Sequence, residues 1–228
     1  MNKHASIKMA DLLDGNSALL GVLLRLGIGF GFGEDTVGEV CRKAGISPET
    51  FLLICNVYTL EGYVPSAEFM SNVNLGDIVK YLRMSHTYYM EEAMSSLEED
   101  LSRMTEPCDE SLKRIIKGFF SAYRDELSRH FQYEETTVFP YVEALLRHSS
   151  DNSFSIEQFE ENHSNVDEKI GDLKNIVMKY MPASCDSMAV ASALRRLFVL
   201  QSDLARHTWI EDNILVPAVE RLEYSHDK

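Results

Sequence analysis

The sequence predicts an all-α protein in which an up-and-down four-helix bundle follows a small N-terminal helical domain. After about residue 76, apolar residues recur at helical spacing in four long stretches separated by short polar breaks. Few runs alternate apolar β-branched and polar residues, as strands do. A repeat with a period of 77 residues runs through the same region, which predicts a duplicated helical hairpin. Two such hairpins are sufficient to build the bundle.

Residues 1–72 are predicted to form the N-terminal domain, which ends in a polar loop at Ser71–Asn74. The segment 37–54 resembles a helix-turn-helix, with Gly45 in the turn and the second helix starting near Ser47 or Pro48. From position 47 to 57 the only charged residue is Glu49, so binding to DNA phosphates is disfavoured.

The alternating glycines of this domain suggest a nucleotide-binding loop at first sight. Gly27, Gly29, Gly31 and Gly33 alternate strictly, whereas a dinucleotide loop needs the G-x-G-x-x-G register after a strand. Neither condition is met, and the run is interpreted as a turn.

The bundle is predicted to span residues 76–224. Its first helix runs from Leu75 to a break at 104–109, and the second from about Glu110 to 148. A linker at 149–153 joins the halves, and the third and fourth helices are expected at about 155–181 and 187–224. Pro140 and Pro217 are expected to kink or locally end the second and fourth helices, because proline lacks the N–H and its ring clashes with the preceding turn.

The composition narrows the partners and the compartment. A formal net charge of −14 argues against nucleic acid or an anionic membrane as the main partner, because both repel it. The four cysteines form no C-x-x-C pair and are interpreted as reduced thiols. No segment approaches the roughly 20 apolar residues that span a bilayer. The N-terminus leads into Asp11 and Asp14 rather than a signal-peptide core. A cytoplasmic protein is expected.

Two pairs of histidines share the 77-residue spacing, and each member of the second pair is followed four residues later by a glutamate. Positions i and i+4 share one face of a helix, so such a pair presents an imidazole and a carboxylate to the same point. The other pair adds one imidazole from the preceding helix of each hairpin. The candidate metal ligands are therefore His86, His130, Glu134, His163, His207 and Glu211.

Four imidazoles and two carboxylates suit iron, zinc, manganese or copper, and they exceed what one tetrahedral zinc requires. The set predicts two iron ions, bridged by oxo or hydroxo and by the glutamates, with vacant positions for a small ligand. A helical His-x3-Glu pair is also common on surfaces, and a duplicated hairpin could keep the register without metal. Four histidines kept on a core face would then be buried polar groups in need of partners. His4, His148 and His226 lie outside the pattern and are expected to be exposed.

Several neighbouring residues have a less certain role. Glu126 and Asp203 stand four residues before His130 and His207, where they either orient the ligands or are solvated charges. Asp167 stands four after His163, in a position where a further ligand could bind; its repeat equivalent is Met90. Four aromatic residues near the ligands are interpreted as packing groups: Tyr88, Tyr89, Tyr133 and Trp209.

These ligand positions resemble the hemerythrin-like HHE cation-binding family. Hemerythrin oxygen carriers have a fifth histidine where this chain has Asp167, so the pattern is more similar to the di-iron iron–sulfur cluster repair proteins of the YtfE and ScdA type. In the N-terminal domain the resemblance rests on residues 33–46. That family carries two adjacent cysteines just before this stretch, whereas the chain reads Gly29-Phe-Gly-Phe-Gly33 there.

The resemblance implies a di-iron protein of the nitrosative and oxidative stress response that repairs iron–sulfur proteins. It implies oxygen or nitric oxide as the small ligand. Two alternatives stay open: reversible binding or sensing of these gases without turnover, and a regulator whose N-terminal domain transmits the iron state. The sequence assigns no catalytic residue, and any reaction would be nitric oxide or oxygen chemistry at the di-iron centre.

Overall fold

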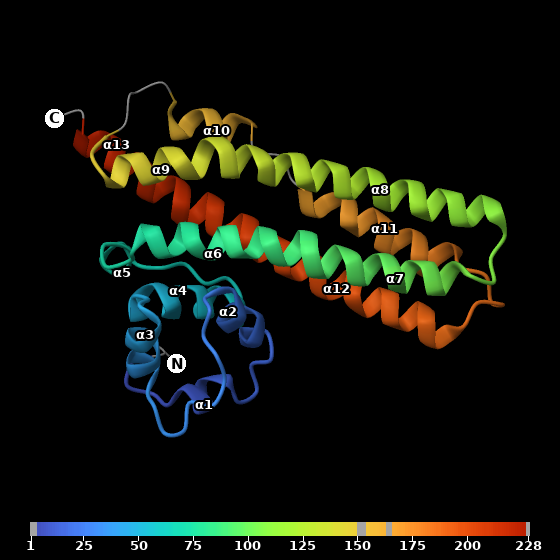
Figure 1. The fold of residues 1–228 in the computed structure, drawn as a ribbon, viewed down its shortest axis with the longest axis horizontal. Coiled ribbons are helices and arrows are strands. Elements are labelled where there is room, and N and C mark those ends of the chain that lie inside the picture. The colour runs from blue at the N-terminus through green and yellow to red at the C-terminus, as the bar shows by residue number, and fades with distance from the viewer. Residues whose placement is uncertain (1–3, 150–153, 163–165, 227–228) are drawn as a thin grey trace. The chain divides into compact units, whose positions relative to one another are not determined.

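The computed structural model (Figure 1) describes residues 4–149, 154–162 and 166–226. These residues form helices and no β-strand, apart from one isolated bridge between Lys8 and Thr36, so the all-α prediction is confirmed. Within the described residues the chain forms two compact units. The first comprises 4–85, 141–149, 154–157 and 209–226, and the second comprises 86–140, 158–162 and 166–208.

The first unit begins with five short helices: α1 (Met9–Leu13), α2 (Leu19–Arg25), α3 (Val37–Ala44), α4 (Pro48–Thr59) and α5 (Ala67–Met70). Helix α3 starts at a capping box, in which the Thr36 hydroxyl accepts from the Glu39 backbone N–H and the Glu39 carboxylate accepts from the Thr36 N–H. Gly45 ends α3 in the left-handed conformation, at φ 68°, and Ser47 caps α4. Both helices and their turn lie where the sequence predicts them.

A buried polar network connects these helices to the first part of α6 (Leu75–Thr87). The Arg25 guanidinium donates to the hydroxyls of Tyr58 and Tyr81, at 3.0 and 3.1 Å, and the Tyr81 hydroxyl donates to that of Tyr58 at 2.8 Å. The backbone N–H of Ser47 also donates to the Asp77 carboxylate. These contacts place residues 75–85 in the first unit, and the predicted domain boundary at 72–76 stays a prediction.

The long helices follow the predicted stretches, but three of them contain a π-helical segment, here labelled η. The first run is α6, η1 (Tyr88–Ala93) and α7 (Met94–Thr105), and the second is α8 (Glu110–Tyr133), η2 (Glu134–Val138) and α9 (Phe139–Leu146). The third comprises α10 (Ile156–Asn162) and α11 (Val166–Tyr180), and the fourth is α12 (Ser187–Ile210), η3 (Glu211–Leu215) and α13 (Val216–His226). Pro140 and Pro217 each occupy the second position of an α-helix that directly follows a π-helical segment, so the α-helical pattern is interrupted before each proline while the helical run continues.

The second unit has its own apolar core, to which α7, α8, α11 and α12 contribute. Figure 1 shows the course of these four helices. Helices α7 and α8 pack against each other as a hairpin, and α11 packs on α8. Core residues recur at the 77-residue spacing, as in Phe120 with Leu197 and Leu127 with Leu204. None of the described helices combines the length and the apolar character needed to cross a membrane.

Candidate metal centre

His86 lies in the last turn of α6 and is 4% exposed. Its ring stacks on Phe131 at a centroid distance of 4.0 Å, and more loosely on Phe139 at 5.4 Å. Nδ1 lies 2.9 Å from Oε1 of Glu135. A carboxylate only accepts hydrogen bonds, so Glu135 favours the tautomer of His86 that carries its proton on Nδ1. In that tautomer the lone pair of the ring is on Nε2, which is the form that binds metal.

Glu134 is the first residue of η2 and is completely buried. Its two oxygens lie near different imidazoles: Oε1 is 3.1 Å from Nε2 of His130, and Oε2 is 3.1 Å from Nε2 of His86. His130 precedes Glu134 by four residues on the same helix, as predicted. A carboxylate withdrawn from water is costly unless a cation or hydrogen-bond donors compensate its charge.

His207, in α12, is 1% exposed and completes a cluster of ligand atoms. Its Nε2 lies 3.3 Å from Nε2 of His86, and its ring meets Tyr89 edge-on. Ligand atoms of His86, Glu134 and His207 all lie within 4.8 Å of one another. Electron-rich nitrogen and oxygen atoms repel at such separations unless a proton or a metal cation lies between them. The donor set therefore fits a metal, and its nitrogen and oxygen atoms suit iron, zinc, manganese or copper.

Of the two remaining predicted ligands, Glu211 and His163, the structure describes only Glu211. Glu211 opens η3, one turn after His207 in an uninterrupted run of helix, and is completely buried. Residues four apart share a helix face, so Glu211 is presented on the side of His207. His163 lies outside the described residues. The side chain of Asp167, the possible further ligand, is also outside them.

Each π-helical segment adjoins a predicted ligand. η2 begins at Glu134, η3 begins at Glu211, and η1 begins two residues after His86. Such segments are rare, occur often at functional sites and shift the phase of every later side chain. They are a local feature of the metal centre that hydrophobic periodicity did not predict.

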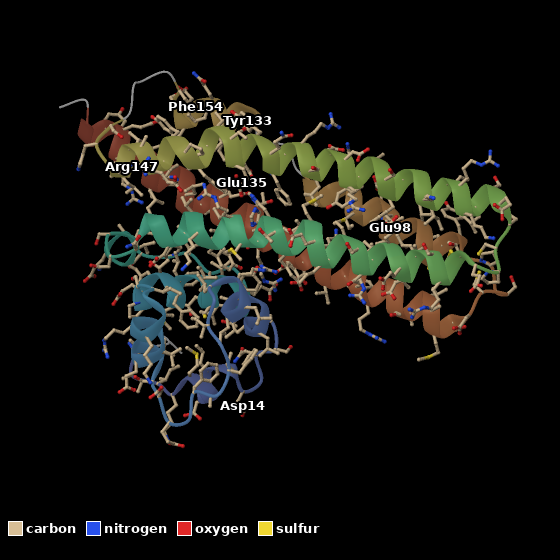
Figure 2. All side chains as sticks on the ribbon, viewed as in Figure 1. Asp14, Glu98, Tyr133, Glu135, Arg147 and Phe154 are labelled. Carbon is tan, nitrogen blue, oxygen red and sulfur yellow. The ribbon has the colours of Figure 1, made fainter. Side chains whose placement is uncertain are left out.

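Glu135 is the functional residue that sequence reasoning missed (Figure 2). It holds the ring of His86 from the Nδ1 side while Glu134 faces Nε2, so two consecutive carboxylates lie on opposite edges of one imidazole. Metal-binding histidines usually donate their other N–H to such a carboxylate, which fixes the ring and makes it a better donor. An acidic residue directly after a ligand glutamate was the only signal in the sequence.

The other residues near the predicted ligands differ in their surroundings. Glu126 forms an ion pair with Lys169, and Asp203 is half-buried. Burial, followed by the charge of Glu134, raises the pKa of the Tyr133 phenol, whose ring stacks on Phe159. Of the histidines expected to be exposed, His4 and His148 are, and the side chain of His226 lies outside the described residues.

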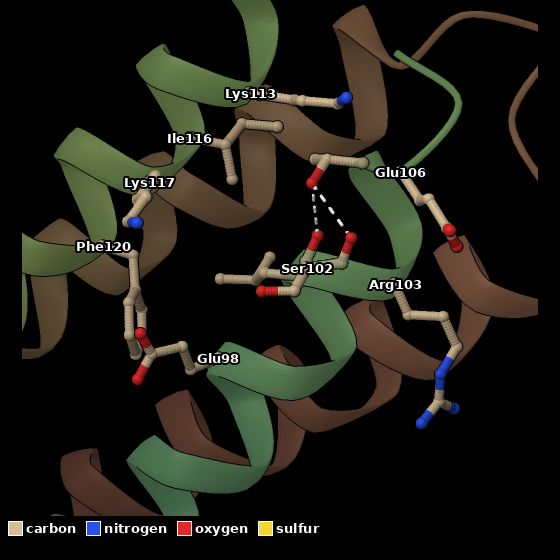
Figure 3. Close-up of a pocket in the computed structure, with 10 residues that line it drawn as sticks. Glu98, Ser102, Arg103, Glu106, Lys113, Ile116, Lys117 and Phe120 are labelled. Carbon is tan, nitrogen blue, oxygen red and sulfur yellow. Dashed lines mark hydrogen bonds between the residues drawn. The ribbon is translucent and has the colours of Figure 1, made fainter. Parts of the chain in front are cut away.

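One surface pocket of the second unit lies away from this cluster (Figure 3). It measures about 530 Å³ and lies between the C-terminal half of α7 and the N-terminal half of α8. Its lining mixes acidic and basic side chains, including Glu98, Glu106, Lys113 and Lys117, and contains none of the six predicted ligands. The chemistry of the buried cluster therefore does not extend into this pocket.

The fold and the cluster together define an all-helical protein with a buried histidine and carboxylate site for a cation. Residues 77–219 match the profile of the hemerythrin HHE cation binding domain, and the chain belongs to this family. The matched region begins in α6 and ends in α13, so it includes every predicted ligand. No curated protein matches the chain.

Proposed function

We propose that the protein is a non-haem di-iron protein whose six ligands are His86, His130, Glu134, His163, His207 and Glu211. The hemerythrin HHE family and the buried cluster of histidine and glutamate support a cation site. The two-iron stoichiometry and the four-helix bundle around it belong to the proposal. The observation that carries it is the position of Glu134, which offers one oxygen toward His86 and the other toward His130. Glu134 would therefore help to hold a cation together with each of these two histidines.

The surrounding residues have defined tasks in this proposal. Glu135 keeps the proton of His86 on Nδ1 and so leaves Nε2 free to act as a donor. Phe131 and Tyr89 pack against the imidazoles and exclude water from the ligand atoms. Two irons held by four imidazoles and two carboxylates would supply vacant coordination positions for nitric oxide or oxygen.

The proposed role is the repair of iron–sulfur proteins during nitrosative or oxidative stress. The two-part chain, with its N-terminal helices followed by the hemerythrin domain, supports this role through its resemblance to the repair proteins. Reversible binding or sensing of oxygen or nitric oxide is the second candidate. One observation favours it: the segment 27–33 of this chain has no cysteine where those repair proteins have two.

Metal analysis of the purified full-length protein tests the site. We expect two irons per chain in the wild type and none in the double variant His86→Ala and Glu134→Ala. His148→Ala is the matched control, because this histidine is exposed, and it should keep both irons. One zinc per chain, or full iron content in the double variant, would exclude the proposed centre.

Two further measurements separate the candidate roles. An iron–sulfur enzyme inactivated by nitric oxide should regain activity when the iron-loaded protein is added, and should not when the metal-free double variant is added. Optical spectra taken during addition and removal of oxygen or nitric oxide report reversible binding. Fully reversible spectra without any recovery of the damaged enzyme would favour the second candidate over repair.

A further inference from the structure

Two thiols of the second unit lie in direct contact. Sγ of Cys108 and Sγ of Cys185 are 3.0 Å apart, and both cysteines are free. A disulfide bond is about 2.0 Å long, so the sulfurs need to approach by only about 1 Å to bond. The side chains are buried but not sealed, because the two residues keep 8% and 6% of their surface. The other two cysteines, Cys41 and Cys55, are fully covered.

The duplication explains this contact. Cys108 and Cys185 are 77 residues apart, which is the spacing of the predicted ligands. Each occupies the turn between two helices, and its N–H donates to a carbonyl three residues earlier, that of Thr105 or Pro182. An aspartate follows each cysteine and accepts a backbone N–H at the start of the next helix. The two turns are therefore built alike and bring the two sulfurs together.

We propose that Cys108 and Cys185 form a thiol pair that a hydroperoxide slowly oxidises to an intramolecular disulfide between the two turns. Nothing in this proposal requires iron, so it stands apart from the proposed function. A small hydroperoxide is the substrate class that fits, because the two cysteines expose only a small part of their surface, which favours a small oxidant over bulky disulfide reagents.

The reaction balances in two steps. The thiolate of one cysteine attacks the peroxide O–O bond, which breaks to leave a sulfenic acid and water once a proton is taken up. The thiol of the second cysteine then attacks the sulfenic sulfur, the S–S bond forms, and a second water leaves. The two thiols lose two electrons and two protons in total, and one hydrogen peroxide is reduced to two waters.

The surroundings keep the pair reduced until an oxidant arrives. Burial, together with the hydrogen bond to Cys185, raises the pKa of Cys108 to about 11, so the thiolate is scarce at neutral pH. The first step is therefore slow. The second step is fast because the attacking sulfur is already in contact, which protects the sulfenic acid from further oxidation.

The test uses the full-length, iron-loaded protein and hydrogen peroxide, quenched with catalase. Oxidation should lower the thiol titre from four to two, remove two hydrogen atoms from the intact mass, and give a linked peptide pair containing Cys108 and Cys185. Cys108→Ser and Cys185→Ser should form no intramolecular link, whereas Cys41→Ser should still form it. Circular dichroism verifies that each variant is folded. If a variant does not fold, the linked peptide pair in the wild type is the result that decides the proposal.

Three outcomes would overturn the proposal: four thiols persist in the wild type, either cysteine gains oxygen without a link, or the link joins two chains. A second readout is thermal. The disulfide closes a long loop, so oxidation should raise the unfolding midpoint by on the order of 10 °C in the wild type and leave Cys108→Ser unchanged. A midpoint lowered by oxidation would show that the turns must be distorted to bond, and would also overturn the proposal.

Discussion

The second unit differs sharply between the two ends of its helices. At one end, His86, Glu134 and His207 bury electron-rich atoms that need a cation or protons among them. At the other, after roughly 30 Å of helix, Cys108 and Cys185 bury two thiols in contact with each other, which need no cofactor. The same 77-residue spacing occurs at both ends, since it separates His130 from His207 and Cys108 from Cys185. The difference shows that a duplication repeats positions, whereas the residue chemistry decides whether a repeated position requires a cofactor.

Metal removal should change the stability of the protein more than any other change considered below, and it should act at the ligand end only. Stripping the metal with a chelator should lower the free energy of unfolding by about 4 kcal/mol relative to protein with free metal at a thousand times its dissociation constant. Thermal unfolding of loaded and stripped samples measures this difference. The double variant Cys108→Ser and Cys185→Ser should lose as much as the wild type, because its ligand end is intact. Equal midpoints of the loaded and stripped wild type would contradict a metal-supported core.

A cavity in the apolar core between the two ends should have the next largest effect on stability. Leu197 is completely buried, and Leu197→Ala should cost about 2–5 kcal/mol because it leaves a cavity. Val199→Ala on the same helix is the control, because this valine is 58% exposed, and it should change stability by less than about 0.5 kcal/mol. Urea denaturation of both variants gives the comparison. A cost for Leu197→Ala as small as the control would show that α12 does not pack as described.

Removing the charge of Glu135, which contacts Nδ1 of His86, should have a smaller effect and should act on metal affinity. Glu135→Gln keeps a hydrogen-bond acceptor but removes the charge, and it should weaken metal affinity by about 10- to 100-fold. Glu92→Gln, an exposed glutamate of η1, should leave affinity unchanged. Competition with a chromogenic chelator measures both constants. Unchanged affinity in Glu135→Gln would remove its positioning role, while a loss in both variants would point to surface charge.

At the other end, in the turn before α8, the reactivity of Cys108 should depend on pH. Because its pKa is raised to about 11, the Cys108 thiol should react with iodoacetamide about ten times faster for each unit of pH between 7 and 10. Burial, Cys185 and Asp109 raise the pKa of Cys108, and the positive charge of Lys113 lowers it. Cys41, whose pKa burial raises to about 12, should label more slowly still. Peptide mass spectrometry gives each rate, and a Cys108 rate that is flat across this range would contradict the raised pKa.

A substitution in the N-terminal helices should have the smallest effect on stability and should change neither the metal ligands nor the cysteine pair. Thr36→Ala removes the capping hydroxyl of α3 and should cost about 1 kcal/mol. Thr36→Ser keeps a capping hydroxyl and serves as the control. Denaturation measures stability, while iron content and the thiol titre should equal those of the wild type. A loss of iron in Thr36→Ala would mean that the N-terminal helices support the metal site directly.

The helices and the ligand end could be predicted because their signals are local or distinctive. Hydrophobic spacing predicted the helices, and the polar breaks that end in Asp109 and Asp186 predicted the starts at 110 and 187, as the structure has them. The His-x3-Glu pairs stand out because imidazole and carboxylate seldom recur together on an apolar face. His86, Glu134 and His207 accordingly meet in the structure.

The features that were missed depend on geometry between distant turns or on backbone hydrogen bonding. The cysteines form no local pairing motif, so their spacing along the chain gives no sign that Cys108 and Cys185 meet across two turns. π-Helical segments have no side-chain signature, so periodicity did not reveal them. Glu135 was missed for a related reason: in a regular α-helix consecutive residues point about 100° apart, which gives no reason to expect both on one imidazole.

The π-helical segments at Glu134 and Glu211 have a consequence for the history of the chain. A π-helical turn is an α-helix with one residue inserted, and the insertion rotates everything after it by about 100°. A one-residue deletion within 134–138 would relieve the bulge, restore ordinary helix and turn Pro140 and the rest of α9 onto a different face. The repeat has kept the bulge at equivalent positions in both halves, so the two helices carry the same extra residue at the same step.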